Sequence, residues 1–442
     1  MDSTDPANTE LQGYQNLLIP ADNQTSEEGR GEGLRIAPLI WWDVKKQLDE
    51  QQAAQDNEDI ECGMSRLSVS PPPKATLQQY AVLGHVPEET QHSHRNPVLL
   101  NTASPWSAFL CGSQGSGKSH TLSCMLENCL LDKPSIGKNP NPLAGLVFHY
   151  DSTQGSGVCE AAYLCSHIPT TVLILRDMAL AENGYDAVNS KTTSPFTYSK
   201  FKQNVKAQLF TDKQNGPLNM RIELLESFIR AQEGKDALVG RPGHLTIIDL
   251  TDPVVDTELA CVLFDICLSV FVAQTPCAKI VALDEAHNYM SDESAAVSAF
   301  TGKLLKTIRE QRHLGTRVVI ATQEPTLNTK LLDLCSITMI HRCTSPAWFV
   351  VLKKHVAGLF LDGSFMLKGE SDGGEGLMES GDKAVFQRIV QLKLGESLLF
   401  CPTAAIAVTD GTVRTMEDRF VRFMTRKRVT ADGGVTRTVE NM

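Results

Sequence analysis

The sequence predicts an α/β fold in which a mainly parallel sheet carries helices on both faces. Three observations support this fold class. From about residue 98, short apolar runs alternate with amphipathic segments. The apolar runs lack a polar–apolar alternation, which is typical of strands buried on both faces. One run is joined to an amphipathic segment by a glycine-rich turn at residues 112–119, as expected of a strand–loop–helix unit.

The expected strands are short and rich in apolar side chains. They cover residues 106–111, 143–150, 171–175, 245–250, 279–283, 317–322, 337–341 and 397–400. The expected helices carry apolar residues at every third or fourth position, so that each buries one face. They cover residues 118–131, 218–232, 257–273 and 295–312.

Composition divides the chain into three regions. Residues 1–75 contain 14 acidic and 6 basic side chains and end near three consecutive prolines, so we expect a disordered acidic leader. Residues 76–412 are expected to form the folded domain, with a polar helical insertion at 177–243. Residues 413–442 form a basic tail, for which nucleic acid, a neighbouring subunit and no specific partner are all open.

An apolar stretch at residues 34–44, which contains Trp41 and Trp42, interrupts the leader. A short helix that docks onto the main body or onto a partner would explain this stretch. A local hydrophobic cluster is the alternative.

Composition also excludes several classes of protein. Hydrophobic residues make up 42% and charged residues 21%, as in globular proteins. The longest apolar stretch, 259–273, contains Asp265 and is shorter than the ~18 residues of a membrane span, so we expect a buried helix. The N-terminus does not resemble a secretory signal, and the twelve cysteines are scattered. We therefore expect an intracellular protein, nuclear or cytoplasmic.

The glycine-rich turn fits the phosphate-binding pattern G-x-x-x-x-G-K-[ST], because it reads GSQGSGKS. Glycines allow backbone angles that direct N–H groups at phosphate oxygens. Lys118 would bring positive charge to the β- and γ-phosphates, and Ser119 would offer its hydroxyl to Mg²⁺. We therefore expect ATP and Mg²⁺ as ligands. The residues expected to hold the nucleotide are Gly112, Ser113, Gln114, Gly115, Ser116, Gly117, Lys118, Ser119 and His120.

Two adjacent acids, Asp284 and Glu285, directly follow the expected strand at 279–283. This pattern matches a Walker B motif, in which the aspartate holds Mg²⁺ and the glutamate acts as general base toward water. The strands at 246–249 and 148–151 also end in aspartate and are rivals, but no glutamate follows either one. A solvated acidic turn is the remaining alternative.

Three further residues are candidates for catalysis. Gln323 ends the expected strand at 317–322 and would contact the γ-phosphate or position water, unless it is simply a turn residue before Pro325. Arg309 and Arg312 share one helix face and would stabilise transition-state charge, with a neighbouring subunit as the usual source of such an arginine. The alternative is a favourable interaction with the helix dipole.

Several of these segments resemble the HerA/FtsK group of P-loop ATPases. They are LDEAHNYM (283–290), LLKTIREQRHLGTRVVIATQEP (304–325), LTIIDLTDP (245–253) and LKLGESLLFCP (392–402). A narrower resemblance is to uncharacterised fungal P-loop NTPases. It rests on NTASPWSAFLCGSQGSGKSH (101–120), FHYD (148–151) and RKRVTADGG (426–434).

This resemblance implies a RecA/ASCE-like P-loop NTPase fold and a hexameric ring with a central pore that moves double-stranded DNA. It also implies that Asp284 and Glu285 are the Walker B pair, that Gln323 ends the sensor strand and that an arginine acts across subunits. The function expected from the sequence is therefore an ATP-hydrolysing oligomeric motor without a membrane span. The alternative is a nucleotide-dependent switch or scaffold that acts on a protein partner without DNA.

Overall fold

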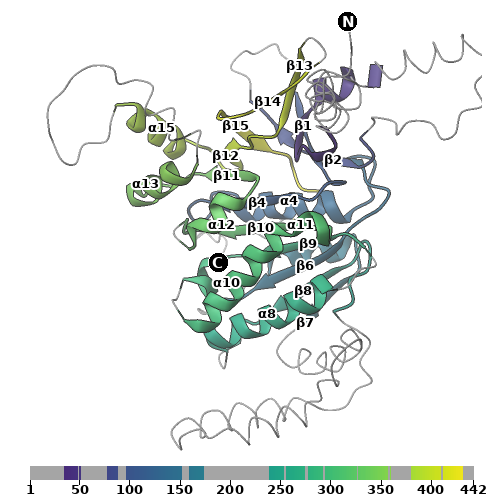
Figure 1. Ribbon diagram of the computed structural model, residues 1–442, viewed down its shortest axis with the longest axis vertical. Coiled ribbons are helices and arrows are strands. Elements are labelled where there is room, and N and C mark those ends of the chain that lie inside the picture. Colours follow the sequence, from purple (N-terminus) through teal and green to yellow (C-terminus); the bar gives the residue numbers. More distant parts are fainter. Residues whose placement is uncertain are drawn as a thin grey trace, which may run out of the picture.

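The computed structural model describes residues 34–47, 49–50, 77–87, 96–151, 159–173, 238–252, 255–273, 277–291, 294–325, 327–356, 359, 380–409 and 412–431. Within these ranges the strands form one 15-stranded sheet, ordered β14-β13-β1-β3-β2-β15-β12-β11-β4-β10-β9-β6-β8-β7, with β5 paired to β2 (Figure 1). Several predicted regions lie outside the described residues. They are the helix at 218–232 with most of the insertion around it, the end of the tail at 432–442, and the leader except for 34–47 and 49–50.

Seven consecutive strands of the sheet are parallel, which confirms the predicted fold class in the half of the sheet that carries the glycine-rich loop. In spatial order they are β11 (Ile337–His341), β4 (Ser107–Cys111), β10 (Thr316–Thr322), β9 (Lys279–Leu283), β6 (Ala144–His149), β8 (Leu245–Asp249) and β7 (Thr170–Leu173). Each of them was expected from the sequence. The strand β10 lies between β4 and β9 and pairs in parallel with both.

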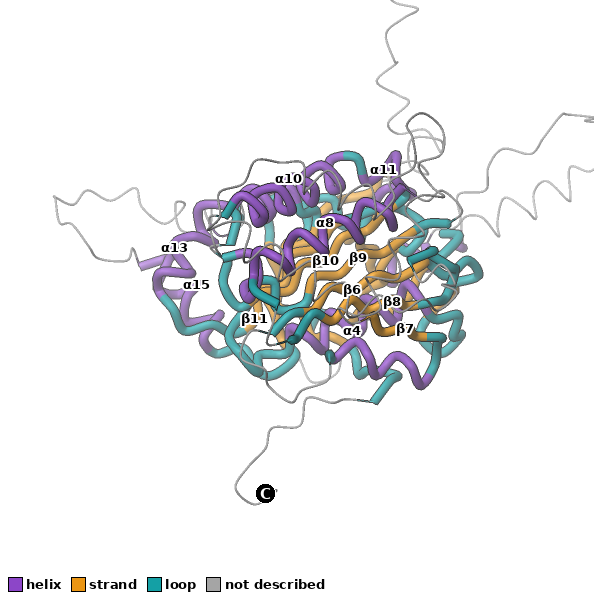
Figure 2. The backbone as a smooth tube through the Cα atoms, turned by 90° about the horizontal axis from the view of Figure 1, so that it is seen from below, coloured by secondary structure: helices purple, strands orange, loops and turns teal. Residues whose placement is uncertain are grey.

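Helices cover both faces of this parallel half (Figure 2). One face carries α4 (Lys118–Leu130). The other carries α8 (Thr257–Ala273) and α10 (Ala295–Arg309). Neighbouring residues of one strand enter different cores: Phe109 packs on the α8 and α10 side, and Leu110 on the α4 side. Because both faces are buried, the strands show no polar–apolar alternation.

The remaining helices are short. They are η2 (Glu160–Ser166), α9 (His287–Met290), α11 (Gln311–Leu314), α12 (Thr329–Leu334), α13 (Pro346–His355) and α15 (Ser380–Val390). The helix expected at 295–312 is thus two helices, which meet at Glu310. The expected buried helix α8 buries one face only, and Val262 and Ile266 are exposed on it. No described helix has both the length and the apolar character to cross a membrane.

The second half of the sheet is largely antiparallel and was expected only at β12. Its strands are β12 (Glu396–Phe400), β15 (Phe420–Thr425), β2 (Tyr80–His85), β3 (Pro97–Asn101), β1 (Leu39–Trp41), β13 (Ala405–Thr409), β14 (Thr412–Thr415) and the short β5 (Gly137–Lys138). The apolar stretch at 34–44 does dock onto the main body. Its residues 39–41 form strand β1 between β3 and β13, and residues 34–36 and 42–47 on either side are helical. The body therefore begins before residue 76 and continues past residue 412, because β1, β14 and β15 complete its sheet.

The chain after β15 lies along α4 and is held there by a buried carboxylate. We call residues 425–430 the strap. Glu127 of α4 is fully buried and accepts hydrogen bonds from Arg426 Nη1 at 2.7 Å, from Thr430 N at 2.9 Å and from Val429 N at 3.0 Å. Burial alone would raise the pKa of Glu127, but the hydrogen bonds from Thr430 and Arg426 hold it below its ordinary value. The carboxylate is therefore ionised and tied to the strap.

Replacing Arg426 should destabilise the protein, because Glu127 would keep a buried charge with only neutral partners. We expect Arg426→Ala to lower the free energy of unfolding by about 3 kcal/mol at neutral pH, measured by urea denaturation. Since the folded-state pKa of Glu127 lies below 4.5, the difference from the wild type should shrink as the pH falls through that pKa. The exposed Arg419 offers a control, and Arg419→Ala should change stability little. Equal stabilities of Arg426→Ala and Arg419→Ala would contradict the role of the strap.

Candidate nucleotide-binding site

The glycine-rich loop connects β4 to α4 and depends on backbone angles that favour glycine. Gly112, Gly115 and Gly117 have φ values of 153°, 68° and 105°. A β-carbon at Gly112 would lie 2.7 Å from His341 Cβ, and one at Gly117 would lie 2.9 Å from Gly395 N. Both the backbone angles and the close packing therefore require glycine at positions 112 and 117.

Neighbouring segments fix the loop from two sides. Ser113 N donates to Arg342 O at 2.9 Å, which joins the loop to the chain after β11. Gly395 N donates to Ser116 O at 3.4 Å, and Thr425 N donates to Gly395 O at 3.2 Å. The loop is thus in hydrogen-bonded contact with the turn before β12 and, through that turn, with the last residue of β15.

Lys118, the first residue of α4, is only 4% exposed. Its Nζ donates to Ser113 O at 3.2 Å, so the side chain folds back over the loop. Burial lowers the pKa of Lys118, while the negative charges of Glu285 and Asp284 oppose that shift. The ammonium group therefore lies in the field of the two acids that the sequence assigned to the Walker B motif.

Asp284 and Glu285 follow β9 at the edge of the sheet where the loop lies. Asp284 is 3% exposed, and its Oδ1 has no hydrogen-bond partner among the described residues. Glu285 has φ 47°, a left-handed conformation that is uncommon for residues other than glycine. Ala286 N donates to Ala321 O at 2.9 Å, which holds this turn against β10. Backbone strain of this kind occurs often at functional sites.

Gln323 directly follows β10 and contacts one of these acids, Glu285. Its Nε2 donates to Glu285 Oε2 at 3.4 Å. His287 Nδ1 lies 3.4 Å from the same oxygen, and burial lowers the pKa of His287 despite the nearby charge of Glu285. The structure therefore brings together Lys118, Asp284, Glu285 and Gln323, as the sequence predicted. His287 is an addition that the sequence analysis did not place in the site.

One of the two rival aspartates of the sequence analysis, Asp249, lies farther from the loop. It ends β8, whereas Asp284 follows β9, and three strands separate β8 from β4. At about 4.8 Å per strand, β8 is roughly 19 Å from β4 and β9 only half as far. The order of strands therefore favours Asp284 as the metal ligand.

Arg309 and Arg312 are not brought to the loop. The helix α10 crosses from the carboxyl end of β9 back to the amino end of β10, so its last residue Arg309 lies at the opposite edge of the sheet. The seven residues of β10 separate the two edges by roughly 20 Å. Both arginines are exposed. Neither can serve the loop of its own subunit, because a guanidinium does not span such a distance.

His120 and Ser119 differ in how they relate to the loop. The ring of His120 is hydrogen-bonded through Nε2 to Arg426 O of the strap at 2.8 Å. This hydrogen bond directs the His120 side chain toward the strap, so it does not support the expected contact with a nucleotide. Ser119 is half-buried and is the second residue of α4, so it lies at the positive end of the helix dipole.

Two observations show that the site fits a nucleoside triphosphate and its Mg²⁺. A buried ammonium and the start of a helix face the loop, which is the arrangement that attracts phosphate. Ser116 Oγ and Asp284 Oδ1 are buried polar atoms without hydrogen-bond partners among the described residues, and such atoms call for an unseen partner. Ser119 and Asp284 supply the oxygen ligands that Mg²⁺ prefers.

Glycine at position 117 should be required for nucleotide binding. We expect Gly117→Ala to weaken nucleotide binding at least about tenfold, since the new β-carbon would meet Gly395 N and the φ of 105° strains any other residue. Gly302 of α10 is a matched control, because nothing lies within 4 Å of a β-carbon built there. Gly302→Ala should keep binding and add up to about 1 kcal/mol of stability. Wild-type affinity in Gly117→Ala, measured by calorimetry, would show that the loop does not hold phosphate.

Comparisons with known proteins found similarity in structure only, since no family model and no curated protein matches the sequence. The genome packaging NTPase B204 from Sulfolobus turreted icosahedral virus 2 aligns with 67% of this chain and 92% of its own length, at 10% identity and a TM-score of 0.34. VirB4 of Thermoanaerobacter pseudethanolicus aligns with 79% of this chain and 97% of its own length, at 11% identity and a TM-score of 0.42.

EssC (ATPases 2 and 3) from Geobacillus thermodenitrificans aligns with 83% of this chain and 49% of its own length, at 13% identity and a TM-score of 0.31. Similarities at this level determine neither activity nor substrate. The geometry of the chain itself is decisive for the fold: a glycine-rich loop joins β4 to α4, β10 lies between β4 and β9, and an acidic pair follows β9. The chain therefore has a P-loop NTPase fold.

Proposed function

We propose that the chain is an Mg²⁺-dependent ATPase. The observation that carries this proposal is the convergence of a buried lysine, two acids and a glutamine at one edge of the sheet. The negative charges of Glu285 and Asp284 act on Lys118, and Gln323 donates to Glu285. Lysine and aspartate suit the phosphates and their metal, while glutamate and glutamine suit a water molecule that attacks the terminal phosphate.

Each residue has a distinct role in this proposal. Lys118 and the loop backbone bind the phosphates, and Ser119 and Asp284 hold Mg²⁺, which neutralises phosphate charge. Glu285 takes a proton from the attacking water, and Gln323 orients Glu285 through the 3.4 Å hydrogen bond between Nε2 and Oε2. A kinase, which transfers phosphate to a substrate hydroxyl, is disfavoured because a glutamate directly after the metal-binding aspartate suits the activation of water.

Glu285→Gln should separate binding from hydrolysis. The amide cannot accept a proton from water, so we expect turnover to fall at least about 100-fold while the affinity for Mg²⁺·ATP stays within a few-fold of the wild type. Glu310 is a matched control, because it lies between α10 and α11 and forms an exposed ion pair with Lys306. Glu310→Gln should hydrolyse ATP normally. Full turnover in Glu285→Gln, measured by phosphate release, would assign the base to another residue.

The finer proposal is that the protein acts as an oligomeric motor. It is supported by the sequence resemblance to the HerA/FtsK group and by the position of Arg309 and Arg312. Both side chains are exposed at the edge of the sheet that lies opposite the loop. In a head-to-tail ring, one face of each subunit meets a different face of the next, so an exposed arginine of one subunit would reach the loop of its neighbour. A hexameric ring is the assembly that the resemblance favours.

Double-stranded DNA is the proposed substrate of the motor, and a protein partner is the alternative. The DNA proposal rests on the sequence resemblance. The alternative keeps the same nucleotide site but uses ATP binding as a switch, with slow turnover. The net charge of −11 argues against broad nucleic-acid coating, so DNA contact would have to be local, as in a pore.

Double-stranded DNA should stimulate ATP turnover. We expect turnover to rise several-fold with DNA at low salt and this stimulation to weaken at high salt, because phosphate contacts release counterions. Heparin at equal charge is the control for a nonspecific polyanion effect. An active ATPase that neither binds DNA nor responds to it would exclude the DNA motor and leave the switch. Phosphate release and DNA retardation should be measured on the same preparations.

A further inference from the structure

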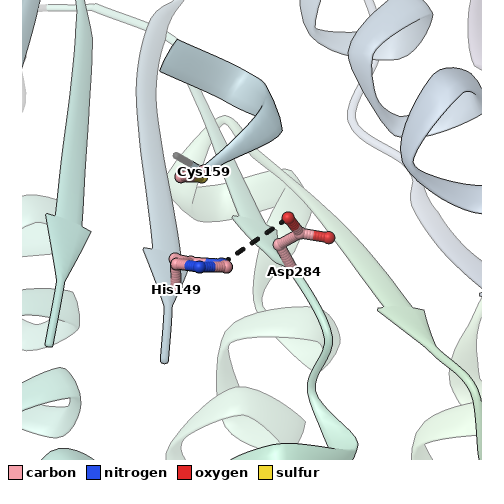
Figure 3. A group of neighbouring side chains, drawn as sticks. All are labelled: His149, Cys159 and Asp284. Carbon is pink, nitrogen blue, oxygen red and sulfur yellow. Dashed lines mark ion pairs between the residues drawn. The ribbon is translucent and has the colours of Figure 1, made fainter. Parts of the chain in front are cut away.

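Three metal-ligating side chains of different chemistry meet beside the acidic pair. They come from three elements: His149 ends β6, Cys159 precedes η2, and Asp284 follows β9 (Figure 3). One ligand atom from each residue lies within 4.8 Å of the other two. No other group of this kind occurs among the described residues. The sequence does not indicate this group, because Asp284 lies far along the chain from His149 and Cys159.

The spacing of these atoms fits a shared cation better than a direct hydrogen bond. His149 Nδ1 lies 3.7 Å from Asp284 Oδ2 (Figure 3), which is within the range of an ion pair when the ring is protonated but too long for a hydrogen bond. In a tetrahedral zinc site with bonds of about 2.0–2.1 Å to nitrogen and oxygen, two ligand atoms are roughly 3.4 Å apart. A shift of a few tenths of an ångström would bring this pair to that spacing, and the Cys159 sulfur lies within 4.8 Å of both ligand atoms.

The burial of these side chains, and polar atoms that lack a partner among the described residues, also favour a bound cation. Cys159 and Asp284 are 2% and 3% exposed. Within the described chain, His149 Nδ1 and Asp284 Oδ1 are buried atoms without a hydrogen-bond partner. His149 also pairs in register with Asp249 of β8, and the negative charges of Asp284, Asp249 and Asp151 act on its ring. A cation placed among these groups would be attracted by several carboxylates.

We propose that His149, Cys159 and Asp284 bind Zn²⁺. Sulfur, imidazole nitrogen and carboxylate oxygen are the donor set of zinc sites, whereas Mg²⁺ takes oxygen ligands. Zinc binds the thiolate, so the Cys159 proton is released to solvent when the metal enters. Three protein ligands leave the fourth tetrahedral position for water. The site is distinct from the phosphate loop but shares Asp284 with the proposed Mg²⁺ site.

Zinc at this site would inhibit hydrolysis, and this part of the inference rests on the proposed ATPase. A zinc ion that holds Asp284 Oδ2 neutralises the carboxylate on which Mg²⁺ depends. It also places a second divalent charge next to the Mg²⁺ position. We therefore expect zinc to weaken the binding of Mg²⁺ at the acidic pair and to slow ATP hydrolysis.

Metal binding should be tested directly on the full-length protein without nucleotide. We expect the wild type to bind one equivalent of Zn²⁺ at micromolar concentration or tighter, and Co²⁺ in its place to give the thiolate-to-metal charge-transfer band. Cys159→Ala should lose that band and bind Zn²⁺ at least about tenfold more weakly. Cys165 is exposed in the same short helix η2, so Cys165→Ala should match the wild type. His149→Gln provides a second loss of ligand if Cys159→Ala folds poorly, as judged by circular dichroism.

Two results would overturn the zinc site: no Zn²⁺ binding by the wild type, or wild-type affinity and an intact charge-transfer band in Cys159→Ala. In these cases His149 would only be a neighbour of Asp284. Turnover is a separate measurement. Zn²⁺ should inhibit the wild type and Cys165→Ala, but at least about tenfold more Zn²⁺ should be needed for Cys159→Ala, whose turnover without zinc stays normal. Zinc binding in a protein that never hydrolyses ATP would refute the proposed ATPase and leave the metal site standing.

Discussion

The burial of the Lys118 ammonium is the constraint on which the rest of the site depends. A lysine that is 4% exposed must have compensating negative charge, because desolvation of an unpaired ion costs several kcal/mol. Asp284 and Glu285 supply that charge, and bound phosphate would supply more. The charges of the two acids act on Lys118 because only β10 separates the strand before the loop from the strand before the acids. Strand order and electrostatics therefore define one site.

The loop that carries Lys118 is held by parts of the chain far from it in sequence. Gly395 packs against Gly117, and the strap is bonded to α4 at His120 and Glu127. The antiparallel half of the sheet positions these segments, because Gly395 directly precedes β12 and the strap follows β15. These two strands are the first of that half beside the parallel strands. Strands β12 and β15 thus stabilise the conformation of the nucleotide loop, and the loop geometry depends on both halves of the sheet.

The sequence predicted best those features for which a function or a buried position restricts the residue type. The parallel strands, the glycine loop and the pair Asp284 and Glu285 follow from buried apolar runs and from residue types that phosphate and Mg²⁺ require. Even Gln323 could be placed, because it ends the strand next to the acids. Each of these features depends on neighbouring residues along the chain or on the shared edge of parallel strands, and both are visible in a sequence.

Other features depend on contacts between distant segments and were missed. The strand β15 has a half-exposed burial pattern and contains Arg422 between Arg419 and Arg426, so the segment was predicted to be a basic tail. The contact of Glu127 with Arg426 and the proximity of Cys159 to Asp284 could not be predicted, because no residue nearby in the sequence specifies either one. Arg309 does end a helix, but Arg312 lies in the separate helix α11 and not on the same helix as predicted. The sequence also did not show that this end lies at the far edge of the sheet.

The central claim is that Lys118 and the acidic pair form one Mg²⁺·ATP site, and nucleotide binding by Lys118→Ala tests it most directly. Equilibrium binding of Mg²⁺·ATP should be measured by calorimetry for Lys118→Ala, the wild type and Lys306→Ala, whose side chain is exposed on α10. The account predicts that Lys118→Ala loses detectable binding while Lys306→Ala keeps it. Wild-type affinity in a folded Lys118→Ala variant would contradict the account.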